Sequence, residues 1–500
     1  MIDIESRARL FGRGGVIRRL LGVLRSSKLV TNAGVYVLGN VLQKSVAFLL
    51  IPVYTRYLTP DDYGITGLGI ALGSVLAIAL GFGIFGSVAR HYYDYRDSPV
   101  HLKQFITSSF LFVLVAAGVI TLVLNYVGPV VWPMVTSGQV PFSPFIRVVL
   151  LSSYAELLIQ IPLSLYRTQQ RAMAFVIAQI STFTLTLSAT ILFVVVWRMG
   201  AYGQLLGYLV GYSVMAVVLT ALLFKEWWSL PLNWGYLGTS LAYGLPLVPH
   251  SLAGWAMASV DRLLLEPRVS LGELGLYNLG YQIGMAMSVL VYSVNQAWSP
   301  YYYDLMKRGR EPGQRVRQVT DLYVVLLGGI CLLGALFSQE IIAILAPARY
   351  LAAARYVPLI LFSYLLNGYY FFASMPLFYH KKTQLIPIVT GASAALNIVL
   401  NLWWIPTWGA LGSAWATLVS YVLALVIAYL LARRWDVTSY SLGRFGALNA
   451  IVFFGVVYAT YGRPLGSAID WSLKFGLLAL FACISWLWLI RPNLKPKHFG

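Results

Sequence analysis

The sequence predicts an all-α membrane protein: about fourteen transmembrane helices form two parallel-repeat, six-helix lobes around a central cavity, followed by two C-terminal helices. Three observations predict this fold. The 500-residue chain is 59% hydrophobic and only 11% charged, whereas a soluble domain carries about 25% charged residues. It also contains many apolar stretches of membrane-spanning length, and an internal repeat relates its two halves.

Residues 1–30 are expected to form a basic cytoplasmic arm. Seven cations fall within the first 28 residues. No long apolar core with a small-residue cleavage site precedes Asn32, so this segment is not expected to be a cleaved signal peptide. It suits the anionic headgroups of membrane lipids. Since the cations gather in the arm and the loops, the net charge of +19 predicts a membrane-surface role and no nucleic-acid partner.

The predicted spans follow one another with short loops. A spanning helix needs about 20 mostly apolar residues. We assign helices 1–6 to an N-lobe (31–230), helices 7–12 to a C-lobe (231–435), and the last two helices with a cytoplasmic tail to 436–500. The fourteen segments are 31–53, 64–89, 104–127, 144–166, 172–197, 201–224, 236–261, 273–300, 318–338, 356–379, 384–405, 409–432, 443–461 and 470–490.

The distribution of lysine and arginine predicts the orientation. With a cytoplasmic N-terminus, cytoplasmic segments hold 26 of the 36 cations and external loops hold eight. This bias follows the positive-inside rule. One missed helix would invert every later loop, so the bias also supports the count of fourteen and places both termini in the cytoplasm.

An internal repeat has an offset near 210 residues. LTPDDYGITGLG (58–69) matches VSLGELGLYNLG (269–280), and GAYGQLLGYLVGY (200–212) matches GALGSAWATLVSY (409–421). The offset spans six helices, an even number, so both copies have the same orientation. Parallel repeats of this kind are one established plan for transporters, with a substrate site between the lobes.

The stretch IPVYTRYLTPDDYG (51–64) resembles the P-x-x-T-R-x-L-[ST]-P-x-[DE]-[YF]-G signature of polysaccharide biosynthesis flippases. YGLPLVPHSL (243–252), with the Asp261-Arg262 pair after it, is similar to the second lobe of that family. These are the Wzx-type O-antigen and exopolysaccharide flippases of the multidrug/oligosaccharidyl-lipid/polysaccharide exporter superfamily. The resemblance implies a V-shaped, two-lobed fold in the bacterial inner membrane. It also implies an undecaprenyl-diphosphate-linked oligosaccharide as cargo.

Polar residues in or bordering the spans are the candidate substrate site, because ionisable groups are costly to place in lipid. Asn40 and Lys44 belong to a polar stripe on the first helix, and a cation there suits a diphosphate. The alternative is polar packing between helices. The residues we expect to contact the diphosphate or sugars are Lys44, Arg90, Arg147, Arg262, Asn40, Asn278 and Gln282.

Two acids fall within spans, Glu156 and Asp261, and both are candidates for coupling transport to H⁺ or Na⁺. Glu156 lies in the middle of its segment, and its alternative role is an ion pair with Lys44 or Arg147. Asp261 lies near the external end of its helix, next to Arg262. Its alternative role is a helix cap or salt bridge.

The predicted function is therefore translocation of the lipid-linked oligosaccharide from the cytoplasmic to the periplasmic leaflet by ion-coupled alternating access. The polysaccharide polymerase and the chain-length regulator are possible partners. No Walker A, HExxH or GxSxG sequence occurs, so we expect neither an enzyme nor a cofactor. Lipid II flippases and multidrug or cation antiporters of the same superfamily stay open as alternatives. A membrane-embedded glycan polymerase or ligase is less favoured, because the external loops are short and poor in acids.

Overall fold

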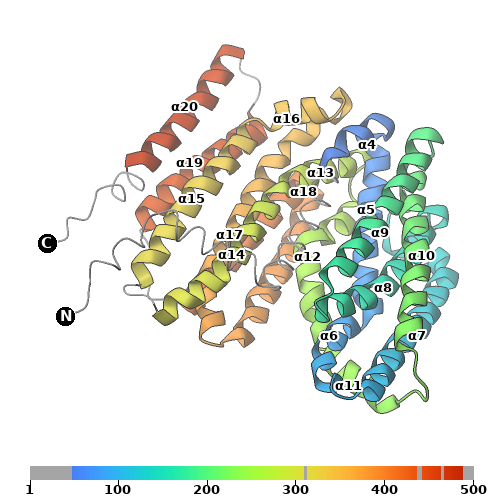
Figure 1. Ribbon diagram of the computed structural model, residues 1–500. Coiled ribbons are helices and arrows are strands. Elements are labelled where there is room, and N and C mark those ends of the chain that lie inside the picture. Colours follow the sequence, from blue (N-terminus) through green and yellow to red (C-terminus); the bar gives the residue numbers. More distant parts are fainter. Residues whose placement is uncertain (1–47, 309–311, 436–441, 463–466, 488–500) are drawn as a thin grey trace, which may run out of the picture.

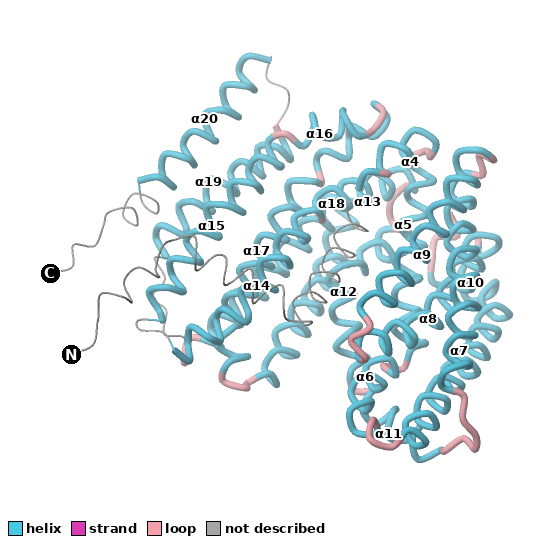
Figure 2. Tube along the Cα trace, viewed as in Figure 1, coloured by secondary structure: helices cyan, strands magenta, loops and turns pink. Residues whose placement is uncertain are grey.

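The computed structural model describes residues 48–308, 312–435, 442–462 and 467–487, and these residues form helices and loops without a strand (Figures 1 and 2). Ten helical stretches among them are long and apolar enough to cross a membrane. The predicted all-α, multi-pass membrane fold is confirmed, but the count of fourteen spans is not. Residues 31–47 of the first predicted span, 31–53, lie outside the described residues.

We group the helices of residues 60–244, on the right of Figure 1, as the N-lobe, which adds residues 231–244 to the predicted range of 31–230; the short helix α4 (Ile51–Tyr57) precedes them. Its helices are α5 (Pro60–Gly81), α6 (Ile84–Tyr95), α7 (Pro99–Val135), α8 (Arg147–Thr168), α9 (Ala172–Ile191), α10 (Gly200–Trp227) and α11 (Trp234–Gly244), with the π-helical turns η1 (Phe142–Ile146) and η2 (Leu192–Val196).

The C-lobe comprises residues 247–432, and two further helices follow it. Its elements are α12 (Leu247–Leu265), α13 (Leu271–Gly284), α14 (Ala286–Arg308), α15 (Pro312–Leu336), α16 (Ser338–Leu345), η3 (Ala348–Arg355), α17 (Val357–Tyr379), η4 (Thr383–Leu385) and α18 (Ile386–Ala432). The two C-terminal helices are α19 (Leu442–Tyr461) and α20 (Ser467–Ser485).

Some predicted segments contain breaks. The segment 64–89 divides into α5 and α6 because Phe82 and Gly83 both have positive φ angles. The segment 236–261 divides into α11 and α12 at Pro246, whose nitrogen has no hydrogen to donate to the helix. As a result, α11 packs against α6 and α7 of the N-lobe, whereas α12 packs against α18 of the C-lobe.

The two halves share one hydrogen-bonding arrangement, which supports the repeat found in the sequence. In the N-lobe, the Asp62 carboxylate near the start of α5 accepts a 2.8 Å hydrogen bond from the backbone N–H of Ala201. In the C-lobe, the Glu273 carboxylate near the start of α13 accepts a 2.9 Å bond from the N–H of Ala410. A carboxylate at a helix N-terminus satisfies a free donor and suits the helix dipole.

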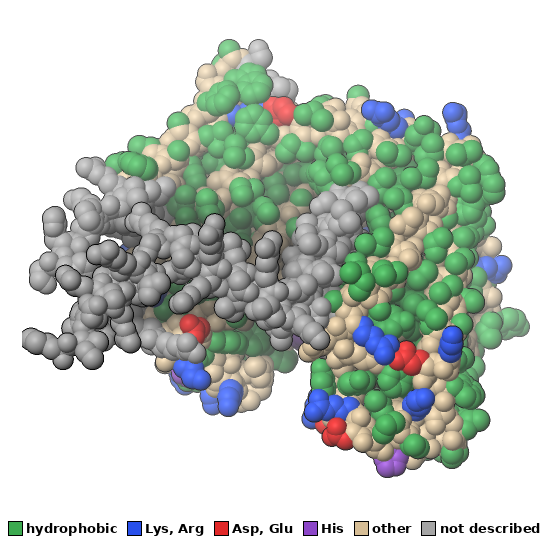
Figure 3. Space-filling view, viewed as in Figure 1, with side chains coloured by type: hydrophobic (Ala, Val, Ile, Leu, Met, Phe, Trp, Pro, Cys, Tyr) green, Lys and Arg blue, Asp and Glu red, His purple; other side chains and the backbone are tan. Residues whose placement is uncertain are grey.

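The lobes meet where α5 and α13 begin, at the upper end in Figure 1, and there the backbones of the two helices approach each other closely. A Cβ atom on Gly64 would lie 2.2 Å from the carbonyl oxygen of Leu271. On Gly275, it would clash with the carbonyl of Pro60. Only glycine fits both positions. At the lower edge of the molecule, Figure 3 shows a notch between the lobes.

The final helix is attached to the C-lobe through a buried cation. Lys474 of α20 contacts the carboxylates of Glu340 on α16 and Asp470 on α20. The lysine is 4% exposed, and two carboxylates compensate its charge. α20 packs against α15 and α19, so this ion cluster adds an electrostatic link to an apolar contact.

Candidate functional site

A buried ion pair lies on α12, close to the junction of the lobes. Asp261 is 3% exposed and Arg262 is 8% exposed. Arg262 Nη1 donates a 2.7 Å hydrogen bond to Asp261 Oδ1, and the Tyr277 hydroxyl donates to Asp261 Oδ2. A buried charge is tolerated only when it is paired and hydrogen-bonded. The structure therefore contains the salt bridge that is the alternative role of Asp261.

The guanidinium of Arg262 is held in one orientation. Its Nε donates a 3.1 Å bond to Asn278 Oδ1, and its Nη1 also donates to the carbonyl of Ala258. The guanidinium carbon lies 3.8 Å from the ring centroid of Tyr281, a cation–π contact that a desolvated site strengthens.

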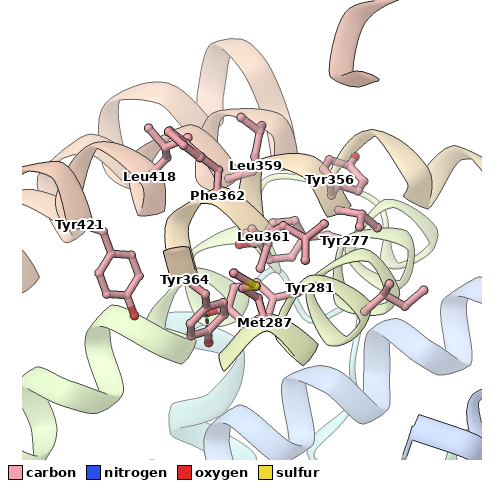
Figure 4. Packing of buried hydrophobic residues seen from close by; sticks show 14 of the residues in the cluster. Tyr277, Tyr281, Met287, Tyr356, Leu359, Leu361, Phe362, Tyr364, Leu418 and Tyr421 are labelled. Atoms are coloured by element: carbon pink, nitrogen blue, oxygen red, sulfur yellow. Dashed lines mark hydrogen bonds between the residues drawn. The ribbon is translucent and has the colours of Figure 1, made fainter. Parts of the chain in front are cut away.

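Tyrosines from three helices support this cation. The hydroxyls of Tyr281 on α13 and Tyr364 on α17 lie 3.2 Å apart, and Figure 4 shows them pointing toward each other. The ring of Tyr421 on α18 packs against Tyr364. These rings support the guanidinium from the C-lobe side, and Arg262 also lines the space between the lobes.

That space is a cavity of about 420 Å³ that both lobes line. The C-lobe side includes Arg262, Asn278 and Gln282. On the N-lobe side, residues of α5, α9 and α10 face them. Arg262 is the one charged side chain among the described residues that line the cavity.

Hydrogen bonds across the lobe junction close one side of the cavity. The Tyr63 hydroxyl of α5 donates a 3.1 Å bond to Gln282 Oε1 of α13. Asn278 Nδ2 donates a 3.4 Å bond to the carbonyl oxygen of Tyr63. Asn278 therefore contacts both Arg262 and the opposite lobe, so the cation and the junction share one hydrogen-bond network.

The N-lobe wall consists of neutral polar residues that the sequence analysis did not single out. They recur every four residues, on one face of each helix. The signal was visible in the sequence as two period-four polar stripes. These residues are Thr182, Thr186 and Thr190 on α9, and Gln204, Tyr208 and Tyr212 on α10.

Glu156, the second predicted coupling residue, does not line the cavity. It is half-buried on α8, and it makes no hydrogen bond or ion pair with another described residue. Its carboxylate lies near Tyr208 and Tyr212 of the N-lobe wall. The predicted pair with Arg147 is not formed, because Arg147 is exposed at the start of α8.

The structure does not bring Arg90 or Arg147 into the cavity. Arg90 lies on the surface of α6 and forms a 2.8 Å ion pair with Asp94. That hydrogen bond raises the pKa of the Arg90 guanidinium. Asn40 and Lys44 lie outside the described residues. The structure therefore groups Arg262, Asn278 and Gln282 in the cavity, with Asp261 directly behind them.

Known proteins match both the sequence and the fold. The profile of the family described as "Polysaccharide biosynthesis protein" matches residues 29–306. Two proteins of Haemophilus influenzae are each 22% identical to the chain: an "Uncharacterized membrane protein" over 400 residues, covering 79% of this chain and 92% of its own, and "Lsg locus putative protein 1" over 406 residues, covering 77% and 95%.

Two solved structures show the same fold at low identity. "Lipid II flippase MurJ, inward closed conformation" superimposes with a TM-score of 0.72 at 13% identity and covers 91% of this chain and 99% of its own. An inward-facing multidrug resistance MATE family transporter of the MOP superfamily gives a TM-score of 0.59 at 14% identity, covering 81% and 96%. The helical membrane fold expected from the sequence is confirmed.

Proposed function

The chain belongs to the polysaccharide biosynthesis protein family, and from this premise we propose that it is a flippase for an undecaprenyl-diphosphate-linked oligosaccharide. It carries the head of this lipid from the cytoplasmic to the periplasmic leaflet by alternating access of the two lobes. The protein resides in the bacterial inner membrane with both termini in the cytoplasm, as the lysine and arginine bias predicts. It acts as a transporter, not an enzyme, and delivers its cargo to a polysaccharide polymerase and its chain-length regulator.

The observation that carries the proposal is the buried Asp261–Arg262 pair at a cavity shared by two lobes. A cation inside a membrane protein is costly and usually marks a substrate or ion pathway. The charged diphosphate is likewise costly to place in the hydrocarbon of the membrane. A guanidinium group in the cavity can donate two hydrogen bonds to a phosphate. It therefore lowers the free-energy barrier for moving the diphosphate across the membrane.

Arg262 is the proposed diphosphate contact, with Asn278 and Gln282 as neighbouring donors. Binding there would compete for the bonds that Asn278 makes to Arg262 and Tyr63. Cargo at the cation would thus weaken the junction between the lobes. Lys44 and Asn40 stay sequence-based candidates for the same site. Arg90 and Arg147 are the weaker candidates, because neither lines the cavity.

Of the two coupling candidates, Glu156 is the better supported. Asp261 is already neutralised by Arg262 and Tyr277, so it has little remaining capacity for another cation. Glu156 has no charged or hydrogen-bonding partner among the described residues. A half-buried carboxylate of this kind can bind H⁺ or Na⁺ at a low cost in lost protein contacts.

Deletion of the gene in the source bacterium tests this function. We expect loss of surface polysaccharide, accumulation of lipid-linked oligosaccharide inside, and unchanged growth and drug resistance. Wild-type protein should restore the polysaccharide and the Arg262→Ala variant should not. Lysis on deletion would point to lipid II as the cargo, and drug hypersensitivity would point to an antiporter. Polymer elongation by the purified protein would point to an enzyme.

A further inference from the structure

The N-lobe wall of the cavity combines hydroxyl, amide and aromatic groups on two adjacent helices. Its members are Thr182, Thr186, Thr190, Gln204, Tyr208 and Tyr212, and we call this set the hydroxyl wall. It faces the C-lobe side, where Arg262 lies. The cargo proposed above has two chemically different parts, a charged diphosphate and a sugar chain, and the cavity likewise has two different sides.

Two polar atoms of the hydroxyl wall have no partner in the protein. The Oγ1 atom of Thr190 and the Oε1 atom of Gln204 are buried and accept or donate no hydrogen bond among the described residues. Thr190 is fully buried and Gln204 is 6% exposed. Buried polar groups are nearly always hydrogen-bonded. Both residues line the cavity, so a side-chain rotation that brings these atoms to its surface would let a ligand satisfy them.

The aromatic part of the wall is a pair of parallel rings. Tyr208 and Tyr212 stack with centroids 6.1 Å apart and planes inclined by 16°. The Tyr208 hydroxyl accepts a 3.3 Å bond from Gln204 Nε2. The two tyrosines thus provide aromatic surface next to polar groups. The C–H face of a pyranose ring with its surrounding hydroxyls is complementary to such a surface.

Charge is nearly absent from this environment. Among the described lining residues Arg262 alone is charged, and the carboxylate of Asp261 compensates it. The hydroxyl wall therefore offers no counter-charge to a carboxylate on a sugar. Bringing a carboxylate against this wall would leave it desolvated and without a cation among the six wall residues, which is strongly unfavourable.

We propose that the hydroxyl wall binds uncharged sugar residues and that the protein therefore selects lipid-linked oligosaccharides without sugar carboxylates. The inference rests on the proposed flippase function and names its substrate class. The diphosphate occupies the Arg262 side while a neutral sugar stacks on Tyr208 and Tyr212. Gln204 and Thr190 donate or accept hydrogen bonds with the sugar hydroxyls.

Two probes in proteoliposomes containing the full-length protein test the selection. One is a polyprenyl-diphosphate N-acetylglucosamine disaccharide, and the other carries glucuronic acid as its second sugar. We expect the neutral probe to be flipped faster by about tenfold or more, because the acid would be buried without a partner. Equal rates, or a faster acidic probe, would overturn the selection and leave the flippase function intact. Transport of neither probe would overturn the function itself.

Variants of the hydroxyl wall test whether the wall is responsible for the selection. Gln204→Lys places a cation beside the stacked rings and should shift the ratio of the two rates toward the acidic probe. The ratio is measured within one preparation, so it does not depend on the folded fraction. Tyr212→Leu should slow the neutral probe. The matched control is Tyr202→Leu, on the same helix but packed against Phe145 and away from the cavity. An unchanged ratio in Gln204→Lys would overturn the assignment.

Discussion

The Ser137 hydroxyl donates a 2.7 Å hydrogen bond to Oε1 of Glu266, and this bond ties the loop after α7 to the C-terminal end of α12. The backbone N–H of Ser137 donates a second, 3.0 Å bond to the same carboxylate. Glu266 has no exposed surface. The contact joins the N-lobe to the C-lobe, so any motion that separates the lobes here must expose a carboxylate that is now enclosed.

Replacement of Glu266 by alanine should favour separation of the lobes at this contact, because two donors of Ser137 lose their acceptor. Each lost bond costs about 1–3 kcal/mol in a buried setting. We expect several-fold faster labelling of a Ser259→Cys reporter, which lines the cavity, by an impermeant maleimide added outside intact cells. The background is Cys483→Ser, since Cys483 is exposed and Cys331 is buried.

Glu226→Ala is the matched control for this measurement, because Glu226 pairs with Arg171 at the surface of the N-lobe and joins no lobes. Equal labelling in the Glu266→Ala and Glu226→Ala proteins would show that the Ser137–Glu266 contact does not hold the lobes together.

Arg262→Ala should abolish flipping and also destabilise the protein by about 3–5 kcal/mol, because it leaves the buried carboxylate of Asp261 without its cation. The double variant Asp261→Asn/Arg262→Ala should regain most of the stability without regaining transport. Thermal unfolding in detergent and probe flipping in proteoliposomes measure the two effects separately. A double variant no more stable than the single one would refute the pairing argument.

Arg262→Lys examines the geometry of the same cation. Lysine keeps the charge, but its ammonium group is not planar. It therefore cannot stack on the Tyr281 ring and at the same time donate a hydrogen bond to Asn278 as the guanidinium does. We expect near-normal stability. Flipping should be slower by at least about tenfold, because one charge-assisted hydrogen bond to the diphosphate is lost. Wild-type rates in Arg262→Lys would show that charge alone suffices at this position.

Glu156→Gln should uncouple transport from the ion gradient with little loss of stability, since Glu156 has no partner among the described residues to lose. Flipping in proteoliposomes should then be equal with and without an imposed H⁺ or Na⁺ gradient. The comparison variant is Glu340→Gln, whose carboxylate pairs with Lys474 far along the chain, and it should keep the gradient response. A response that persists in Glu156→Gln would exclude this residue as the coupling group.

Gly200→Ala and Gly409→Ala should each destabilise the protein by about 1–2 kcal/mol, because both glycines have positive φ angles (59° and 56°). An added Cβ would also lie 2.8 Å from Asp62 Oδ1 and 2.6 Å from Glu273 Oε1, respectively. Gly476→Ala, with no atom within 4 Å of its added Cβ, is the control and should not lower the apparent melting temperature. Similar losses at 200 and 409 would support the equivalence of the two halves.

The sequence predicted the candidate site only in part. Arg262, Asn278 and Gln282 were expected to contact the substrate, and all three line the cavity. The threonine and tyrosine stripes of α9 and α10 were not singled out, although their spacing of four was visible. Neutral polar residues are common in packed helices, so their spacing alone does not separate a cavity wall from an interhelical contact.

The fold class, the apolar segments and the internal repeat could be recognised from the amino-acid sequence, because hydrophobicity and matched glycines are properties of local stretches of chain. Which polar groups meet depends on how the helices pack against one another. Asp261 is adjacent to Arg262 in the chain, but its hydroxyl donor, Tyr277, belongs to another helix. Glu156 and Arg147 share α8 and remain apart. A buried charge is neutralised only if helix packing brings a partner to it. The sequence of one segment does not show which residues of other helices will lie next to that charge.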